Sequence, residues 1–378
     1  MVDIVVIRSA NSIVYDPRVK KITGSLKKRY SVVALGWNRD GISQEKINDY
    51  PVKTELFNLR TTTWKPSLLR ILIRLFVFFP PFWIWVFVKL LEYRPEVVHA
   101  CDMDTFPPAY IYKVLLRKKL VFDVFDRYGM ALIPQRFKKL NCVINYLEEL
   151  FSKHSDALIV AGGDKVLRTF RSKPKIHEVL LNCPHDYFEG NTNQNAENEN
   201  HDFRLVYTGG IRKDRALEAI TQTLIDLDMV TFLVAGPIID SEVLETIQKS
   251  KRVEYFGVLE PKDALFLEAR SDVLLALYNP KIFWNNITLP NKLFEAMMCG
   301  IPIITNTSAE IVSQTRCGLI VEYDNINQIK DAIKTLKDNP KLRDELGDNG
   351  RRAFLENYNW NIMEKRLYHL YENLLVKP

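Results

Sequence analysis

Short, strongly apolar runs alternate with stretches of helical periodicity along almost the whole chain, and this alternation limits the fold more than any other feature. Apolar runs separated by helices are typical of parallel β-strands that are buried on both faces of a sheet. The sequence therefore predicts an α/β fold built from doubly wound parallel sheets. The expected strands are residues 4–7, 32–35, 97–100, 120–124, 157–160 and 178–181, followed by 204–207, 231–235, 253–256, 273–277, 302–305 and 319–321.

A polar, asparagine-rich segment separates these strands into two groups. Residues 190–202, GNTNQNAENENHD, contain too little apolar surface to be buried, so we interpret them as an exposed linker. We expect residues 1–189 and 203–358 to form two domains that face each other across a central cleft, because such sheets bind ligands at the carboxyl ends of their strands. The last helix, within residues 359–378, is expected to pack back on the first domain. Its apolar face consists of Leu367, Leu370, Tyr371 and Leu374.

The composition bears on the compartment and the partners. The five cysteines are scattered and form no CxxC pair, which is typical of reduced thiols and of neither a disulfide framework nor a zinc site. The N-terminal residues MVDIVVIRS have no basic region before an apolar core, so we expect a cytoplasmic protein. The net charge of +6 suits phosphate-rich ligands or an anionic membrane surface. The sequence contains no basic stripe interleaved with aromatic residues, so we do not expect it to bind nucleic acid.

Residues 68–91, LLRILIRLFVFFPPFWIWVFVKLL, are intensely apolar and aromatic. The uncharged stretch between Arg74 and Lys89 is shorter than the ~20 residues that cross a bilayer, and two adjacent prolines, Pro80 and Pro81, interrupt it. Two interpretations remain open. The segment forms a pair of helices buried against the first sheet, or it lies in a membrane interface and holds the protein at the inner face of the cell membrane.

The loop after the first strand, SANSIVYDPRVKK, contains no glycine, which argues against the dinucleotide-binding fold of dehydrogenases. Asp16 and Pro17 predict the start of a helix, with Asp16 as the N-cap and Pro17 at the first helical position. Arg18 lies in the first turn of that helix, where a cation opposes the helix dipole. This placement indicates an anionic partner for Arg18.

Polar side chains also follow the third and fourth expected strands of the first half. Asp104 alone is explained equally well as a helix N-cap, and metal binding is not expected because a second histidine is missing. Carboxylates at a sheet edge accept hydrogen bonds from hydroxyl-rich substrates, and one of them can take a proton from an attacking hydroxyl. Asp102 and Asp126 are the candidates for that proton transfer. The residues at these strand ends are His99, Cys101, Asp102, Asp104, Asp123 and Asp126.

In the second half, YTGGIRKDRALEAI leads from a strand through a glycine turn into a helix. A flexible turn with cations at a helix start predicts a cradle for a diphosphate, although the P-loop spacing is absent and plain surface charge is the alternative. The residues of this candidate cradle are Gly209, Gly210, Arg212, Lys213 and Arg215.

The most specific segment is ITLPNKLFEAMMCGIPIITN. Pro290 is expected to start a helix that ends at Gly300, with Lys292 in its first turn and Glu295 one turn further along. First-turn amides and Lys292 can hold phosphates, while Glu295 can accept hydrogen bonds from both ribose hydroxyls. The expected donor-binding residues here are Leu289, Pro290, Asn291, Lys292 and Glu295.

These segments together resemble the family-4 retaining glycosyltransferases of the GT-B fold, the group 1 type of glycosyl transferases. The likeness is carried by the DPRV loop, VVHACDMDT, the turn from Gly209 to Arg215, and LPNKLFEAMMCGIPII, which occur in this order over nearly the whole chain. The resemblance implies two Rossmann-like domains and a nucleotide-diphosphosugar donor, UDP- or GDP-linked, with no cofactor and no metal. It implies transfer, with retention, to a glycan or lipid-linked acceptor during the assembly of a cell-surface polysaccharide, glycolipid or glycan.

The same resemblance implies roles for individual residues. Arg215 and Lys292 would stabilise the leaving diphosphate, Glu295 would hold the ribose, and the departing phosphate would help to deprotonate the acceptor. Arg18, His99, Cys101 and Asp104 would lie on the acceptor side.

Two positions depart from the family pattern. Where many members carry a first glutamate the chain has Ile287, and the frequent His–x–His ends here in Cys101. The resemblance therefore does not extend to the identity of the sugar. Two alternatives stay open, namely a sugar-nucleotide 2-epimerase of the same architecture and a membrane-associated partner subunit with impaired catalysis. The small number of histidines, six in all, disfavours the epimerase.

Overall fold

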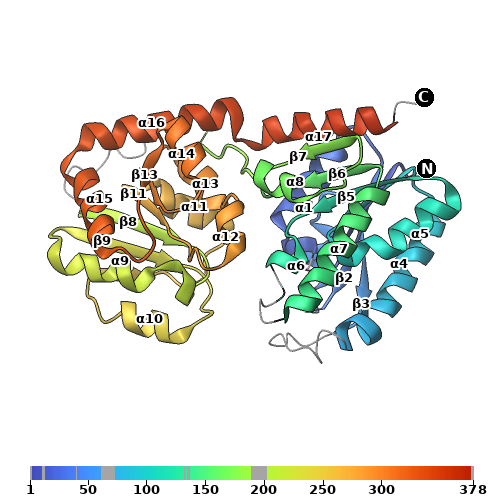
Figure 1. The fold of residues 1–378 in the computed structure, drawn as a ribbon, viewed down its shortest axis with the longest axis horizontal. Helices are drawn as coiled ribbons and strands as arrows, with labels where there is room; N and C mark the ends of the chain where they lie inside the picture. The colour runs from blue at the N-terminus through green and yellow to red at the C-terminus, as the bar shows by residue number, and fades with distance from the viewer. Residues whose placement is uncertain are drawn as a thin grey trace. The chain divides into compact units, whose positions relative to one another are not determined.

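The computed structural model describes residues 2–10, 13–39, 41–60, 73–131, 133, 137–188 and 202–375. The chain divides into two compact units, which are described separately (Figure 1). The first unit comprises Met1–Asn182 and Met363–Pro378, and the second comprises Cys183–Ile362. The sequence placed the divisions after residues 189, 202 and 358. Nearly all of the expected linker, residues 190–202, lies outside the described residues.

The described part of the first unit contains a seven-stranded parallel sheet with the order β3-β2-β1-β4-β5-β6-β7. The strand order reverses between β1 and β4, so the carboxyl ends of these two strands flank the topological switch point of the sheet. The strands are β1 (Ile4–Arg8), β2 (Val32–Asn38), β3 (Lys53–Asn58), β4 (Val97–Cys101), β5 (Lys119–Val124), β6 (Ala157–Val160) and β7 (Ile176–Val179).

The strand β3 was not predicted from the sequence. Its residues KTELFN are exposed or half-buried throughout, because β3 lies at the edge of the sheet. The fully buried strands β1, β2 and β4 have the continuous apolar pattern on which the prediction relied. An edge strand with one solvated side does not have that pattern.

Helices cover both faces of this sheet. The helix α1 starts as predicted, because the Asp16 carboxylate accepts hydrogen bonds from the backbone N–H groups of Arg18 and Val19 and Pro17 occupies the first turn. The other helices are α2 (Gln44–Asn48), α4 (Phe79–Tyr93), α5 (Phe106–Leu116), α6 (Tyr128–Ala131), α7 (Lys138–His154) and α8 (Asp164–Thr169), after α1 (Pro17–Leu26).

The C-terminal helix α17 (Trp360–Leu375), drawn in red, contributes its last three turns to the first unit (Figure 1). The four residues predicted to form its apolar face are all buried. The Tyr368 hydroxyl donates a hydrogen bond to the backbone carbonyl of Ser25, and the Tyr371 hydroxyl lies 2.8 Å from His99 Nδ1. The helix therefore closes the core of a unit that begins more than 300 residues earlier in the chain.

The segment 68–91 is described only in part, because residues 68–72 lie outside the described part of the chain. The π-helical turn η2 (Arg74–Phe78) leads directly into α4, and Pro80 and Pro81 occupy the first turn of α4, where a missing N–H breaks no helical hydrogen bond. Of the expected pair of helices, the described residues show α4, which begins at the prolines, and most of the segment before Arg74 lies outside them. One side of α4 is buried and stacks Phe82 on Trp37, with ring centroids 5.0 Å apart, whereas Ile84 and Val88 are exposed.

The described part of the second unit contains a six-stranded parallel sheet with the order β10-β9-β8-β11-β12-β13. Its switch point lies between β8 and β11, and all six strands were predicted. The strands are β8 (Phe203–Thr208), β9 (Val230–Ala235), β10 (Val253–Tyr255), β11 (Val273–Ala276), β12 (Ile303–Thr305) and β13 (Gly318–Ile320).

The second sheet is also covered by helices, and its core contains residues from β8, β9, β11, α9 and α15. The helices are α9 (Leu217–Thr223), α10 (Ser241–Ile247), α11 (Pro261–Ala269), α12 (Phe283–Ile287), α13 (Asn291–Cys299), α14 (Ala309–Thr315), α15 (Ile326–Asp338) and α16 (Pro340–Asn357).

Candidate functional site

The switch point of the second sheet brings several of the predicted donor-binding residues together. The strand β8 ends at Thr208, and Gly209 and Gly210 follow it. The helix α13 begins at Asn291 after Pro290, which is the N-cap residue and not the first helical residue as predicted. Gly300 ends α13 with a φ of +67°, as expected. Because α13 directs the Lys292 side chain to the end of β8, these two sequence segments meet at one edge of the sheet.

Lys292 is held by three oxygen atoms. Its ammonium donates to Glu268 Oε1 at 2.8 Å, and it also donates to Thr208 Oγ1 and to Glu295 Oε2. The Lys292 side chain is 18% exposed and that of Glu268 is fully buried. Burial alone lowers the pKa of the Lys292 ammonium, but the two carboxylates outweigh burial and hold that pKa above its usual range. Lys292 is therefore a fixed positive charge at this edge.

Glu268, on α11, was not identified in the sequence. Burial raises the pKa of its carboxyl well above the usual range, and the nearby Lys292 ammonium opposes that rise. Its Oε2 atom is buried and has no hydrogen-bond partner within the described part of the chain. The sequence signal is weak, because a single glutamate in the helix PKDALFLEA looks like a solvated side chain.

The glycine turn after β8 is shaped by a close backbone approach. Gly236, which follows β9, has a φ of +140°, and a Cβ atom at this position would lie 1.9 Å from the carbonyl oxygen of Gly209. The Tyr207 hydroxyl donates a hydrogen bond of 2.8 Å to the carbonyl oxygen of Gly210. These contacts fix the path of the chain between β8 and the cationic segment that follows it.

The three cations of the predicted cradle are placed differently. Arg215 packs over the ring of Tyr278, 4.6 Å from its centroid, and pairs with Asp214 Oδ2 at 2.7 Å. Tyr278 follows β11, so Arg215 lies at the switch-point edge. The side chains of Arg212 and Lys213 are 47% and 61% exposed and pair with Asp214 and Glu242. Surface charge, the alternative interpretation, therefore describes Arg212 and Lys213 better than it describes Arg215.

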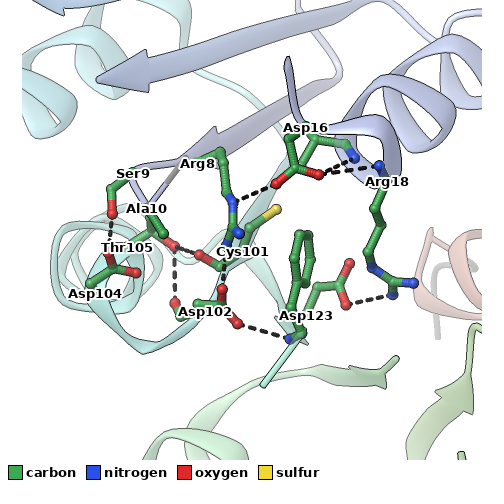
Figure 2. Close-up of polar contacts among 12 residues, drawn as sticks. Arg8, Ser9, Ala10, Asp16, Arg18, Cys101, Asp102, Asp104, Thr105 and Asp123 are labelled. Carbon is green, nitrogen blue, oxygen red and sulfur yellow. Dashed lines mark hydrogen bonds and ion pairs between the residues drawn. The ribbon is translucent and has the colours of Figure 1, made fainter. Parts of the chain in front are cut away.

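The switch point of the first sheet holds a second polar cluster (Figure 2). Arg8, at the end of β1, pairs with Asp16 at 2.9 Å and with Asp102. Asp102 Oδ1 accepts a hydrogen bond of 2.8 Å from the backbone N–H of Phe125. Asp102 has a φ of 65° and a ψ of 169°, a conformation that strains any residue other than glycine. Burial raises the pKa of the Asp102 carboxyl to about 7 in spite of the Arg8 guanidinium.

Asp104 lies beside this cluster but does not cap α5. The N-cap position belongs to Thr105, and the Asp104 carboxylate accepts hydrogen bonds from Ser9 and from the Tyr128 hydroxyl, the latter at 3.0 Å. The N-cap interpretation of Asp104 is therefore wrong. Asp126, after β5, is half-buried and is less enclosed than Asp102 and Asp104.

The remaining residues expected on the acceptor side are internal. The anionic partner predicted for Arg18 is Asp123 of the same unit, 2.8 Å from the guanidinium, and Arg18 also donates to the carbonyl of Leu180 at 2.5 Å. His99 is fully buried, with Asp123 at 3.1 Å and Tyr371 on its other nitrogen. Cys101 is buried as well, and burial raises the pKa of its thiol. The ligand atoms of His99, Cys101 and Asp123 lie within 4.8 Å of one another. Arg18 and Tyr371 already engage two of these three residues.

Residues 202–339 match the family model described as Glycosyl transferases group 1. This segment contains all the residues described above at the second switch point. An uncharacterized glycosyltransferase of Methanocaldococcus jannaschii is 21% identical over 314 residues, which cover 77% of this chain and 71% of that protein. A capsular polysaccharide biosynthesis glycosyltransferase of Staphylococcus aureus is 25% identical over 191 residues, which cover 47% of each chain.

Solved structures agree with the two-unit architecture. The Anabaena protein HepE, in complex with UDP, has a TM-score of 0.73 to this chain at 13% identity. The alignment covers 98% of this chain and all of the HepE chain. At this level of identity the likeness shows the fold alone.

Proposed function

We propose that this chain, a glycosyltransferase of the GT-B architecture, transfers a sugar from a UDP- or GDP-linked donor, with retention, to a hydroxyl of a glycan or lipid-linked acceptor. The product belongs to a cell-surface polysaccharide, glycolipid or glycan, a class suggested by the capsular relative. The observation that carries the proposal is the group of Lys292, Glu268, Glu295 and Thr208 at the switch point of the second unit, which contains the segment that matches the family model. A fixed, shielded cation at the carboxyl end of β8 is where a nucleoside diphosphate would bind.

The residues of the second switch point have complementary chemistry for such a donor. Lys292 and Arg215 place positive charge where a leaving diphosphate gains negative charge, and electrostatic stabilisation of this kind usually contributes more to catalysis than any other effect. Glu295 uses one carboxylate oxygen for Lys292 and keeps Oε1 for ribose hydroxyls. The N-terminal amides of α13 add donors for a phosphate. In the mechanism that the family resemblance implies, the departing phosphate takes the proton of the acceptor hydroxyl.

The acids of the first unit have two different roles in this proposal. Asp102 and Asp104 have internal partners, so we assign to them the organisation of the β1–β4 edge. Asp126 is the most accessible of the three, and we assign to it the hydrogen bond to an acceptor hydroxyl. Arg18, His99 and Cys101 support this edge from within the core.

Nucleotide binding tests the donor assignment. Thermal unfolding should be measured with UDP, GDP, ADP and dTDP, and one of them should raise the stability by about 3 kcal/mol at a concentration of 100 times its Kd. Incubation with the matching sugar donor and analysis of the product then distinguishes transfer from epimerisation. A protein that gains no stability from any of the four nucleotides would overturn the assignment.

We propose that the protein acts in the cytoplasm at the inner face of the cell membrane, and an exposed apolar surface on the first unit supports its contact with that membrane. The segment Phe76–Tyr93 is apolar enough and long enough to span a membrane, with a mean hydropathy of 1.4, and only 22% of it is buried. The helix α4 packs beside α5 (Figure 1). The exposed side chains of α5 are also apolar. We call this the α4–α5 surface. Its exposed residues are Ile84, Val88, Leu91, Ile111, Val114 and Leu115.

A lipid surface is the occupant that we propose for the α4–α5 surface. Interfacial binding grows with apolar area and with attraction to anionic lipids, and the net charge of +6 favours that attraction. Vesicles of phosphatidylcholine with phosphatidylglycerol should float the wild type, and Ile84→Asp with Leu115→Asp should abolish flotation. Ile225→Asp, at an exposed position of the second unit, is the matched control. Concentration-dependent dimerisation without flotation would overturn the lipid assignment.

A further inference from the structure

We propose that Glu268 is a positioning residue for the donor. Its buried carboxylate holds the Lys292 ammonium at the end of β8 and takes up a proton when a nucleoside diphosphate binds there. This inference rests on the proposed function of the second unit. It concerns a residue of α11, whereas the residues already assigned to the donor lie on α13 and on the turn after β8.

The contacts of Glu268 fix the geometry of the cluster. Its Oε1 atom accepts hydrogen bonds from Lys292 Nζ and from Thr208 Oγ1, so one carboxylate oxygen joins α11, α13 and β8. The helix α11 packs against both α13 and β8. Without Glu268, the flexible Lys292 side chain would keep only the Glu295 carboxylate, on its own helix at i+3, and the neutral Thr208 hydroxyl. Glu268 therefore sets the position of the cation relative to the strand end.

The charges around Glu268 do not cancel. From α13 it faces the Lys292 ammonium, the Glu295 carboxylate and the Cys299 thiol, and from β8 it faces the neutral Thr208 hydroxyl. Two carboxylates thus share one ammonium. A fully buried acid that serves packing alone is expected to have both oxygens satisfied, because an unpaired buried polar atom costs free energy. Glu268 Oε2 is buried without such a partner in the described residues, which indicates a role that outweighs this cost.

A bound diphosphate changes this balance. Its negative charges compete with Glu268 and Glu295 for Lys292, and they oppose a buried carboxylate a few ångströms away. The Glu268 carboxyl is already biased by burial toward its neutral form. Binding should therefore add a proton from solvent to Glu268, while its carbonyl oxygen still accepts the hydrogen bond from Lys292. The lysine then keeps its place and directs more of its charge to the phosphates.

Titration calorimetry with the stabilising nucleoside diphosphate tests this inference. The full-length wild type is titrated at pH 7.5 in PIPES and in Tris, which differ in ionisation enthalpy. The difference in binding heat gives the number of protons taken up. The wild type should take up a measurable fraction of a proton, up to about one. Glu268→Gln keeps the hydrogen-bonding shape without a titratable group. It should take up none at this site, and at pH 7.5 it should bind at least as tightly as the wild type, because the amide resembles the protonated carboxyl of the bound state.

Glu148→Gln is the matched control, because Glu148 is also a buried glutamate that pairs with a cation, Arg127, but lies in the first unit. It should leave proton uptake and affinity unchanged. If Glu268 has a structural role alone, Glu268→Gln should be less stable than the wild type but should take up the same number of protons on binding. In that case Glu268→Asp, which keeps the charge, should not restore the lost stability.

The outcomes separate the two proposals. A wild type that binds none of the four nucleotides overturns the proposed function. A wild type that binds one of them with no buffer dependence of the heat overturns the role of Glu268 and leaves the function standing. This measurement needs no variant, so it remains decisive if Glu268→Gln does not fold.

Discussion

Lys292 Nζ lies 2.8 Å from Oε1 of Glu268, a carboxylate that is fully buried in the second unit. The pair joins two helices that the sequence presents as unrelated, and it places a shielded cation at the end of β8. Replacing a buried ion pair as a whole often costs little, whereas removing one partner leaves an uncompensated charge. Variants of this pair therefore report separately on stability and on donor binding.

Lys292→Met should destabilise the protein by about 3 kcal/mol at pH 8, because Glu268 is left buried without its cation. The pKa of Glu268 is already raised by burial, and without Lys292 it rises further. The folded state then holds a proton that the unfolded state releases, so the penalty grows as the pH rises and is smaller at pH 5. Urea unfolding at both pH values measures it.

The double variant Lys292→Met with Glu268→Gln should recover most of that stability at pH 8, since no buried charge remains. Equal losses for Lys292→Met at pH 5 and pH 8 would contradict the assignment of the penalty to Glu268.

Arg215→Ala should lower kcat/KM by ~10²-fold, because it removes one of two cations assigned to the leaving diphosphate. Arg215→Lys should retain part of the activity, since the charge stays although the stacking on Tyr278 is lost. Arg212→Ala should cause a smaller loss, because its side chain is 47% exposed. Initial rates over a range of donor concentrations give these values, with Lys330→Ala, a surface change on α15, as the control. Equal losses for Arg212 and Arg215 would show that the stacked position of Arg215 is unimportant.

Much of the architecture could be predicted because buried segments have a recognisable apolar pattern in the sequence. Strands such as β1, β4 and β11 are apolar at nearly every position, and the helices between them follow capping rules that Asp16 and Gly300 obey. The edge strand β3 lacks this apolar pattern because one side of it is solvated. The prolines of α4 illustrate a related limit, since local sequence does not reveal whether a proline lies within a helix or in its first turn.

The candidate site was predictable only in part. Lys292 and Glu295 belong to one helix, so a short motif identifies both. Glu268 reaches the same point from α11 through the tertiary fold, and no local pattern indicates a buried acid there. Arg18 and His99 were expected at an accessible edge, yet Asp123 holds both of them in the core. Strand-end position predicts which edge a residue occupies but not whether its side chain points outward or is enclosed.

Asp102→Asn should change how stability depends on pH. Burial raises the pKa of Asp102 to about 7, above the value of about 3.9 in an unfolded chain. The contribution of the Asp102 carboxyl to the stability of the folded state is therefore complete below pH 4 and is lost as the pH rises through 7. Relative to wild type, Asp102→Asn should gain stability between pH 5 and pH 8 in urea unfolding. Asp226→Asn, at a carboxylate that is 62% exposed, is the control. A constant difference across this range would mean that Arg8 keeps Asp102 ionised throughout.

Gly236→Ala should disrupt the turn after β8. A Cβ atom at residue 236 would lie 1.9 Å from the carbonyl oxygen of Gly209, and the φ of +140° is unfavourable for alanine. Since backbone cannot yield as a side chain does, the loss of stability should be about 3 kcal/mol, with weaker nucleotide binding because the glycine turn moves. Gly257→Ala is the matched control, because its φ is +71° but no atom lies within 4 Å of the new methyl group. It should cost about 1 kcal/mol of strain and leave nucleotide affinity unchanged. Equal effects of the two substitutions on affinity would show that the approach of Gly236 to Gly209 does not shape the donor site.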